Sequence, residues 1–258
     1  MESVTHHGRE TAYRTANRGG EGPTVLLVHG SGGTSDVWKS QLRIADDYPV
    51  VAVDLSGHGE SDDANADAGY EALSAYVDDV LAVAEETDAT VFVGNSLGGA
   101  VALSAVLQRE VSLDALVLAG TGAKLSVLDD LLAWLRDDFE RAVEFLHEPD
   151  RLFHDASEAY VEHSREAMFE VGREVTERDF LTSHDFDVRG KLDDVEVPTL
   201  ALVGEHDHLT PRSYHEYFVR EIPDCELAVV EDAAHLAMLE EPTAFNAALT
   251  DFLDRRVK

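Results

Sequence analysis

The chain has 258 residues and carries 52 Asp plus Glu against 20 Lys plus Arg, a formal net charge of −32 at pH 7. A surface this acidic argues against binding to nucleic acids or anionic membranes, because their phosphates repel it. No apolar run reaches the roughly 18 residues of a membrane span, and the N-terminus lacks the apolar core of a signal peptide. Because Cys225 is the single cysteine, no intrachain disulfide can form, and we expect a cytoplasmic protein.

Short apolar segments rich in β-branched residues alternate with amphipathic segments along the chain. The apolar segments are typical of parallel strands buried on both faces, and they cover residues 24–30, 49–55, 90–95, 114–120, 198–207 and 226–232. Helical patterns lie between them, near residues 38–46, 73–86, 97–108, 213–221 and 242–255. Residues 3–19 have the pattern of an antiparallel hairpin at a sheet edge. The sequence therefore predicts an α/β fold with a doubly wound, mostly parallel sheet of about eight strands.

One region interrupts this alternation. Residues 128–146 and 156–172 have helical patterns with no convincing strand near them, and no Pro/Gly/Ser-rich linker flanks the region. We therefore expect residues 1–122 and 191–258 to form one core, and residues 123–190 to form a helical cap inserted into it. Seven apolar cap residues are candidates either for a pocket lining or for ordinary core: Trp134, Leu135, Phe139, Phe145, Leu146, Phe153 and Met168.

The segment "VFVGNSLGGAVAL" places Ser96 between a predicted strand and a predicted helix, in a G-x-S-x-G pattern. Such a sharp turn strains the backbone of its central residue and exposes the hydroxyl near a helix N-terminus. Gly94 and Gly98 remove Cβ atoms that would otherwise clash there. A helix N-cap is the ordinary role of a serine at this place, but it does not explain glycine on both sides. We predict that Ser96 is a nucleophile.

A serine nucleophile needs a base, which is commonly a histidine held by a carboxylate. Of the twelve histidines, His235 follows the last predicted strand in a short loop, where it can reach over the carboxyl edge of the sheet. Asp207 follows the strand before it and is the predicted acid, with Asp54 as its rival. His29 is expected to brace the loop after the first parallel strand, and His58 lies in a turn. Seven other histidines are expected at the surface: His6, His7, His147, His154, His163, His184 and His215.

The tetrahedral intermediate of acyl transfer needs two N–H donors for its oxyanion. The backbone of Leu97 is one predicted donor, and the glycine-rich loop "HGSGGTSDVW" supplies the other from Ser31 or, as the alternative, from Gly32. The run His206-Asp207-His208 could also be read as metal ligands, but adjacent residues point in alternating directions and form a poor tetrahedral set. We therefore expect neither a metal nor another cofactor.

These motifs together resemble the α/β-hydrolase fold family. The similarity runs in the family's order through "LLVHGSGGTSDVW", "VAVDLSGHGES", "FVGNSLGGAVAL", "PTLALVGEHDHLTP" and "DAAHLAMLEEP". The resemblance implies a serine hydrolase with an oxyanion loop at residues 30–32, a nucleophile elbow at Ser96 and a helical lid. It also implies that Gly57 and Gly59 form a tight turn near the mouth of the site. Asn95 before the serine is similar to carbon–carbon bond hydrolases and to some esterases, while Ser96 argues against the dehalogenase and epoxide hydrolase branches, which use Asp.

The leading hypothesis is hydrolysis of a small carboxylic ester through an acyl-enzyme, with a small molecule as the only expected partner. The same three side chains would also serve a carbon–carbon bond hydrolase, a lactonase or a perhydrolase, and a ligand receptor on this fold is a further alternative. Acidic residues recur in pairs that we expect to form a solvated coat: Asp46-Asp47, Asp62-Asp63, Asp78-Asp79, Asp129-Asp130, Asp137-Asp138 and Asp193-Asp194. This composition resembles proteins of salt-accumulating halophiles, and the sequence predicts no oligomeric state.

Overall fold

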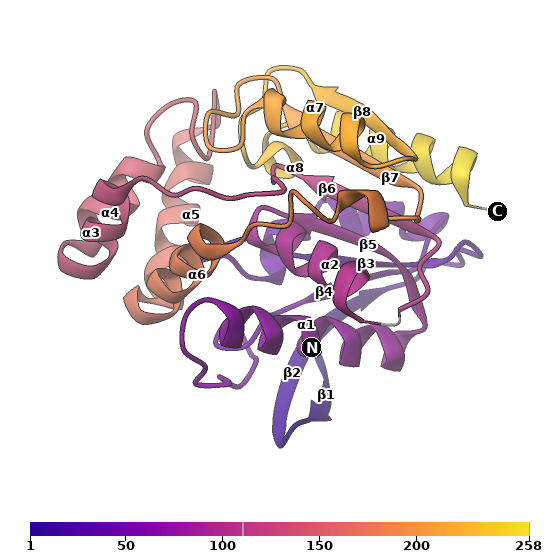
Figure 1. Cartoon of the computed structure of the whole chain (residues 1–258), viewed down its shortest axis with the longest axis horizontal. Helices are drawn as coiled ribbons and strands as arrows, with labels where there is room; N and C mark the ends of the chain where they lie inside the picture. Colours follow the sequence, from indigo (N-terminus) through magenta and orange to yellow (C-terminus); the bar gives the residue numbers. More distant parts are fainter. Residues whose placement is uncertain (110, 258) are drawn as a thin grey trace.

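The computed structural model describes residues 1–109 and 111–257, and its strands form one sheet (Figure 1). The predicted core segments 1–122 and 191–258 each include one residue, 110 and 258, outside the described residues. Within these described residues the sheet has eight strands in the order β1-β2-β4-β3-β5-β6-β7-β8. The strands are β1 (Glu2–His6), β2 (Arg9–Ala16), β3 (Thr24–Val28), β4 (Val50–Val53), β5 (Ala89–Asn95), β6 (Ala115–Ala119), β7 (Thr199–Gly204) and β8 (Cys225–Val230).

Strand direction follows the pattern predicted from the sequence. β1 and β2 form an antiparallel hairpin at one edge, with β2 also antiparallel to β4. The neighbouring pairs from β4 to β8 are all parallel. Strands β3 to β6 are almost wholly buried because helices cover both of their faces, which explains their continuous apolar runs. The expected doubly wound, mostly parallel sheet is thus confirmed.

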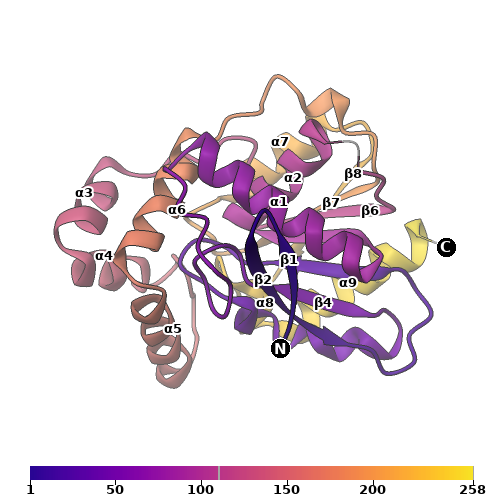
Figure 2. The same cartoon turned by 90° about the horizontal axis from the view of Figure 1, so that it is seen from below.

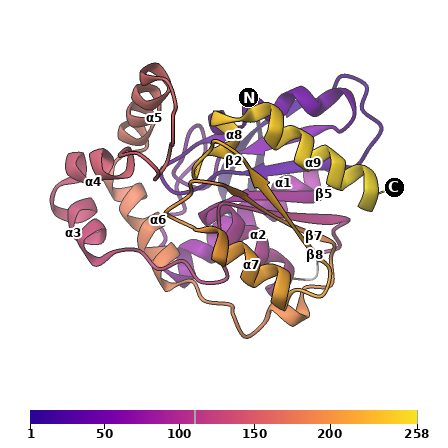
Figure 3. The same cartoon turned by 90° about the horizontal axis from the view of Figure 1, so that it is seen from above.

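Two helical layers enclose the sheet (Figures 2 and 3). Side chains of the helices on one face pack with the sheet in a single apolar cluster, and these helices are α1 (Tyr70–Thr87), α2 (Leu97–Gln108) and α7 (Arg212–Glu221). A second cluster lies on the opposite face, under η1 (Ser35–Trp38), η2 (Gln41–Asp46), α8 (Ala237–Glu240) and α9 (Pro242–Arg256). The two clusters make up the apolar core on the two faces of the sheet. The loops that follow the parallel strands lie at the carboxyl edge of this sheet.

The segment between β6 and β7 is helical and extends from one end of the sheet (Figure 1). Its helices are α3 (Asp129–Asp137), α4 (Phe139–Leu146), α5 (Glu158–Val171) and α6 (Arg173–Asp185). We call residues 123–190 the cap segment. Its division from the core at residues 122 and 190 remains a prediction.

Local capping changes two of the expected helices. The pattern at 128–146 is divided into α3 and α4 at Asp138. Its backbone is not helical (φ −151°, ψ 71°), and its side chain accepts from the Arg141 N–H, so a new helix starts there. The pattern at 38–46 becomes two short 3₁₀ helices, η1 and η2. Side-chain periodicity did not reveal these breaks, because the apolar residues keep the same spacing across them.

The paired acidic residues lie mainly at the surface, with one exception. Asp79 is fully buried on α1, where it accepts hydrogen bonds from Arg9, Thr11 and the Ser56 backbone. The expectation of a solvated coat was therefore wrong for Asp79, because the partly buried Arg9 stabilises its charge. The other members of the six pairs are exposed or partly exposed.

Among the described helices, none is both long and apolar enough to cross a bilayer.

Candidate active site

Ser96 occupies the sharp turn between β5 and α2, at the carboxyl edge of the sheet. Its backbone has φ 55° and ψ −119°, a strained combination for a residue with a side chain. A Cβ atom on Gly94 would overlap the Gly98 carbonyl, and one on Gly98 would overlap the Val28 carbonyl. Both glycines are therefore needed for the turn to pack this closely. The sequence argument for a strained elbow agrees with this geometry.

Asp207 and His235 meet in the loops that follow β7 and β8. Asp207 Oδ2 lies 2.9 Å from His235 Nδ1, and both side chains are almost wholly buried. A carboxylate only accepts, so His235 carries its proton on Nδ1 and leaves Nε2 free to take another. Burial alone would raise the pKa of Asp207, but the His235 charge and hydrogen bonds from His235 and Thr210 hold that pKa below its ordinary value.

The acid loop contains a polar residue that sequence reasoning missed. Thr210 donates its hydroxyl proton to Asp207 Oδ2 across 2.7 Å, and its backbone N–H donates to Oδ1 across 2.8 Å. The Leu209 N–H also donates to Oδ1. The spacing of Asp207 and Thr210, three residues apart in a loop, is the local signal that could have indicated this turn.

Asp54, the rival acid, has a different role. Its carboxylate accepts from the Ser35 N–H at 2.6 Å and from the Glu60 N–H at 3.2 Å. These bonds hold the glycine-rich loop and the following turn, and within the described residues the carboxylate partner of His235 is Asp207. The structure therefore removes Asp54 as the partner of this base.

Asn95 links the serine turn to the histidine loop. Its side-chain amide, fully buried, donates to the carbonyl oxygens of Ala119 and His235, each across 3.3 Å. Ser96 and His235 also line one cavity. Within the described residues their side chains make no hydrogen bond to each other, and such bonds are often long in ligand-free enzymes and tighten in the substrate complex.

The glycine-rich loop lies directly against Ser96, since a Cβ atom on Gly30 would be 2.9 Å from Ser96 Cβ. The Gly32 N–H donates to Asp179 Oδ2 across 2.9 Å, which counts against the Gly32 alternative because this donor is already engaged. No hydrogen bond from the Ser31 N–H is found among the described residues. Leu97 is the first residue of α2, where a backbone N–H has no partner within the helix. Ser31 and Leu97 remain the predicted pair of donors.

The cavity beside these residues has a volume of about 540 Å³ and lies between the sheet edge and the cap segment. Of the seven apolar candidates, Phe145 and Met168 line it. The others belong to the apolar core or pack against it: Trp134, Leu135, Phe139, Leu146 and Phe153. Further apolar lining comes from Leu125, Leu131, Leu152, Phe180, Leu209 and Leu236. Polar side chains, among them Ser96, Thr210 and His235, also line the cavity, so it suits a ligand with a polar reacting group and an apolar remainder.

A sequence model of the alpha/beta hydrolase family matches residues 25–248. The chain belongs to this family. The motifs that carry the resemblance noted in the sequence, within residues 26–103 and 198–242, all lie inside the match.

Several known proteins are similar to this chain over different lengths. An uncharacterised protein of Mycobacterium tuberculosis is 37% identical over 123 residues, which make up 47% of this chain but only 35% of that protein. The chain thus spans about a third of that relative. The pimeloyl-[acyl-carrier protein] methyl ester esterase of Neisseria meningitidis serogroup C is 27% identical, with 89% of this chain and 93% of the esterase covered. The solved structure of a thermophilic esterase is 33% identical, with coverage of 98% and 97% and a TM-score of 0.85.

Two further histidines of this alpha/beta hydrolase are not at the surface. His147 and His215 are buried, contrary to the sequence expectation. His215 packs under the acid loop, where its Nε2 accepts from the Thr121 N–H. His29 braces the glycine-rich loop as expected, through a 2.9 Å hydrogen bond to the Gly30 carbonyl.

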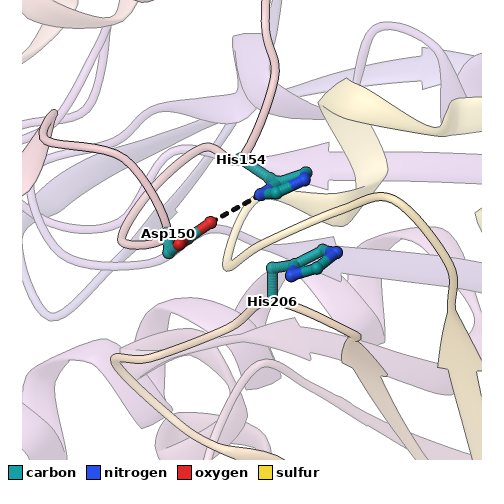
Figure 4. Close-up of side chains that lie close together, drawn as sticks. All are labelled: Asp150, His154 and His206. Carbon is teal, nitrogen blue, oxygen red and sulfur yellow. Dashed lines mark hydrogen bonds and ion pairs between the residues drawn. The ribbon is translucent and has the colours of Figure 1, made fainter.

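A group of possible metal ligands lies beside the acid loop (Figure 4). His154 Nδ1 contacts Asp150 Oδ1 at 2.5 Å, and the His154 and His206 rings stack with centroids 3.6 Å apart and planes only 6° from parallel. A metal lies close to the plane of each imidazole that binds it, so two parallel stacked rings cannot hold one ion unless one ring turns. The observed arrangement is therefore an ion pair between Asp150 and His154, with the His206 ring stacked on His154. His206 lies in this group, whereas its neighbour Asp207 contacts His235.

Proposed function

We propose that this hydrolase cleaves a small carboxylic ester through an acyl-enzyme, with Ser96 as nucleophile, His235 as base and Asp207 as its partner. The observation that carries the proposal is the 2.9 Å hydrogen bond between Asp207 and His235, at the rim of the cavity that Ser96 also lines. A carboxylate at Nδ1 fixes the tautomer that a base requires. Similarity to esterases supports an ester as the substrate.

The reaction follows from the positions of these groups. His235 Nε2 takes the hydroxyl proton of Ser96 as its oxygen attacks the ester carbonyl. The N–H groups of Leu97 and Ser31 stabilise the negative charge that develops on the carbonyl oxygen. His235 then gives its proton to the departing alcohol, which leaves an acyl group on Ser96. A water molecule, deprotonated by His235, attacks this acyl group and releases the carboxylic acid.

Replacement of Ser96 tests the proposal. Ser96→Ala removes the attacking oxygen, so kcat for p-nitrophenyl acetate should fall by about 10⁶-fold while the circular dichroism spectrum is unchanged. Ser126→Ala is the matched control, because Ser126 lines the same cavity but lies in a loop away from the turn. Its kcat should stay within about threefold of the unmodified protein. Retention of most turnover by Ser96→Ala would falsify the assignment.

A substrate panel tests the choice of bond. Esters, lactones, a vinylogous 1,5-diketone and peracid formation from acetate with hydrogen peroxide are compared with the same protein. The proposal predicts the highest kcat/KM for esters. A higher value for another member would keep the three residues but replace the ester by a lactone, a carbon–carbon bond or a peracid. Binding without any turnover would favour the receptor alternative.

A further inference from the structure

Asp179, on helix α6 of the cap segment, lies fully buried beneath the glycine-rich loop. Its carboxylate accepts three hydrogen bonds from three separate segments of the core. The Gly32 N–H donates to Oδ2 across 2.9 Å, His58 Nε2 donates to Oδ2 across 2.8 Å, and the Tyr76 hydroxyl donates to Oδ1 across 2.6 Å. A carboxylate from the cap segment therefore holds a backbone N–H of the loop that borders Ser96.

The hydrogen bonds of His58 determine its charge. Nδ1 lies 3.1 Å from the Ser56 carbonyl, which only accepts, and Nε2 lies 2.8 Å from Asp179, which only accepts in its ionised form. Both nitrogens must therefore carry protons, so His58 is an imidazolium paired with a carboxylate in the interior. Burial lowers the pKa of His58, but the charge of Asp179 and the hydrogen bond to it raise this pKa by more, so the pKa lies above its ordinary value. Asp179 shows the reverse: burial raises its pKa, and His58 lowers it below the ordinary value.

Other charged and titratable groups surround this pair. Arg178 donates to the Tyr76 hydroxyl and to Asp63, and it also reaches the Ser56 carbonyl. The His29 ring lies 4.7 Å from the His58 ring. Its Nε2 accepts from the Leu55 N–H, so it is neutral, and burial together with the His58 charge lowers its pKa to about 4. Among the described residues under the glycine-rich loop, His58 and Asp179 thus form the one ionised contact between a histidine and an aspartate.

The loop is held at two neighbouring points. His29 donates to the Gly30 carbonyl, and Asp179 accepts from the Gly32 N–H. Gly32 has φ +65°, and a Cβ atom there would come within 3.2 Å of Met168 and Thr176 on α5 and α6. The cap segment therefore supplies both the packing surface and the acceptor that set the conformation of Gly32. The Gly32 N–H is engaged by Asp179 and the Gly33 N–H by the Gly30 carbonyl, so among Ser31, Gly32 and Gly33 only the Ser31 N–H has no partner within the described residues.

We infer that Asp179 is a positioning residue of the oxyanion loop: held as a carboxylate by His58, it fixes the Gly32 N–H and thereby aims the Ser31 N–H at the oxyanion. The inference rests on the proposed function for its catalytic consequence. It also makes the oxyanion site depend on the placement of α6, so a ligand that displaces α6 would weaken oxyanion binding without touching Ser96. If Asp179 had only a structural role, its replacement would lower the stability of the fold. It would not specifically weaken the binding of the oxyanion in the transition state.

The test compares Asp179→Asn with Asp79→Asn. Asp79 is the control because it is also a fully buried carboxylate held by a cation and a backbone N–H; it lies next to His58 only through Ser56, and none of its hydrogen bonds within the described residues goes to the glycine-rich loop. The readouts are kcat and KM for p-nitrophenyl acetate and the inhibition constant of a trifluoromethyl ketone, which binds serine hydrolases as an oxyanion. For Asp179→Asn, kcat should fall and the inhibition constant should rise by about 10- to 100-fold, with KM within about threefold. For Asp79→Asn all three values should stay within about threefold.

Equal effects of the two substitutions on kcat and on the inhibition constant would overturn the inference while leaving the proposed function intact. Absence of ester turnover in the unmodified protein would instead overturn the proposed function. In that case, or if Asp179→Asn does not fold, nuclear magnetic resonance of the unmodified protein decides the loop geometry. The inference predicts slow amide exchange at Gly32, fast exchange at Ser31, and protons on both ring nitrogens of His58 at neutral pH. Fast exchange at Gly32 or a neutral His58 would contradict it.

Discussion

At the scale of single residues, several donors hold the buried Asp207 carboxylate. It accepts from His235, from the Thr210 hydroxyl, and from the N–H groups of Leu209 and Thr210. These donors keep it ionised although it is buried, and an ionised carboxylate holds the Nδ1 proton of His235. The loop therefore fixes both the charge of Asp207 and the tautomer of His235.

Asp207→Asn should retain the fold but lower kcat by about 10⁴-fold, because an amide can donate to Nδ1 and thereby favour the wrong tautomer. Steady-state kinetics with p-nitrophenyl acetate measure the loss. Asp187→Asn is the control, since Asp187 is a surface residue paired with Arg189. A kcat of Asp207→Asn within about tenfold of the control would rule out Asp207 as the partner of the base.

Sequence patterns predicted where residues that directly follow a strand would lie. The positions of Ser96, Asp207 and His235 could be predicted because the carboxyl ends of parallel strands meet at one edge, so short loops after different strands converge. Asp179 gave no such signal. It lies in a polar helix, where a carboxylate is ordinarily solvated, and its partner Gly32 is 147 residues away in the chain. Its burial depends on how the cap segment packs, which local periodicity does not encode.

At the scale of elements, the approach of α2 to β3 places Ser96 at the sheet edge. The first turn of α2 lies so close to the end of β3 that Gly98 leaves no space for a side chain beside the Val28 and His29 carbonyls. The strand and helix boundaries predicted for this region agree with the structure because the small residues of α2 and the apolar run of β5 specify the same contact.

Gly98→Ala should destabilise the protein by about 3 kcal/mol, because the added methyl group forces α2 away from β3. The free energy of unfolding in urea measures this change. Gly190→Ala is the matched control, since a Cβ atom at Gly190 meets nothing within 4 Å, and it should change stability by less than about 1 kcal/mol. If both variants unfold at the same urea concentration, the close packing described for α2 is wrong.

Helix breaks in the cap segment were harder to predict than the core elements. α3 and α4 are divided at Asp138, whose side chain accepts from the Arg141 N–H. The residues on both sides of Asp138 are helical, so the side-chain pattern does not mark the break. The strands and α2 were predicted closely because long apolar runs buried on two faces allow few alternatives. A helical segment that is partly exposed to solvent allows more alternative helix boundaries.

At the scale of the whole molecule, buried neutral histidines make stability depend on pH. His215 is fully buried on α7, and its Nε2 accepts from the Thr121 N–H, so it is neutral in the folded state. Burial lowers its pKa to about 4; nearby Asp207 acts to raise that pKa and His235 to lower it. In the unfolded chain a histidine has a pKa of about 6.5. Folding is therefore favoured above about pH 6.5, and this contribution is lost as the pH falls toward 4.

His215→Gln keeps an acceptor but cannot be protonated, so it should reduce the loss of unfolding free energy between pH 7 and pH 4.5 by about 2 kcal/mol. Urea unfolding at several pH values measures the difference. His163→Gln, at an exposed histidine of α5, is the control and should leave the pH dependence unchanged. Identical pH profiles for the two variants would show that His215 does not titrate as described.

The central claim is that Ser96 carries the acyl group during the reaction, and covalent labelling tests it most directly. The protein is treated with a fluorophosphonate, digested and mapped by mass spectrometry, with and without prior saturation by a slowly hydrolysed ester. The account predicts a single label on the peptide that contains Ser96, with the ester protecting it and with no label in Ser96→Ala. Ester turnover that continues while Ser96 stays unlabelled, or a label on another residue that abolishes turnover, would contradict it.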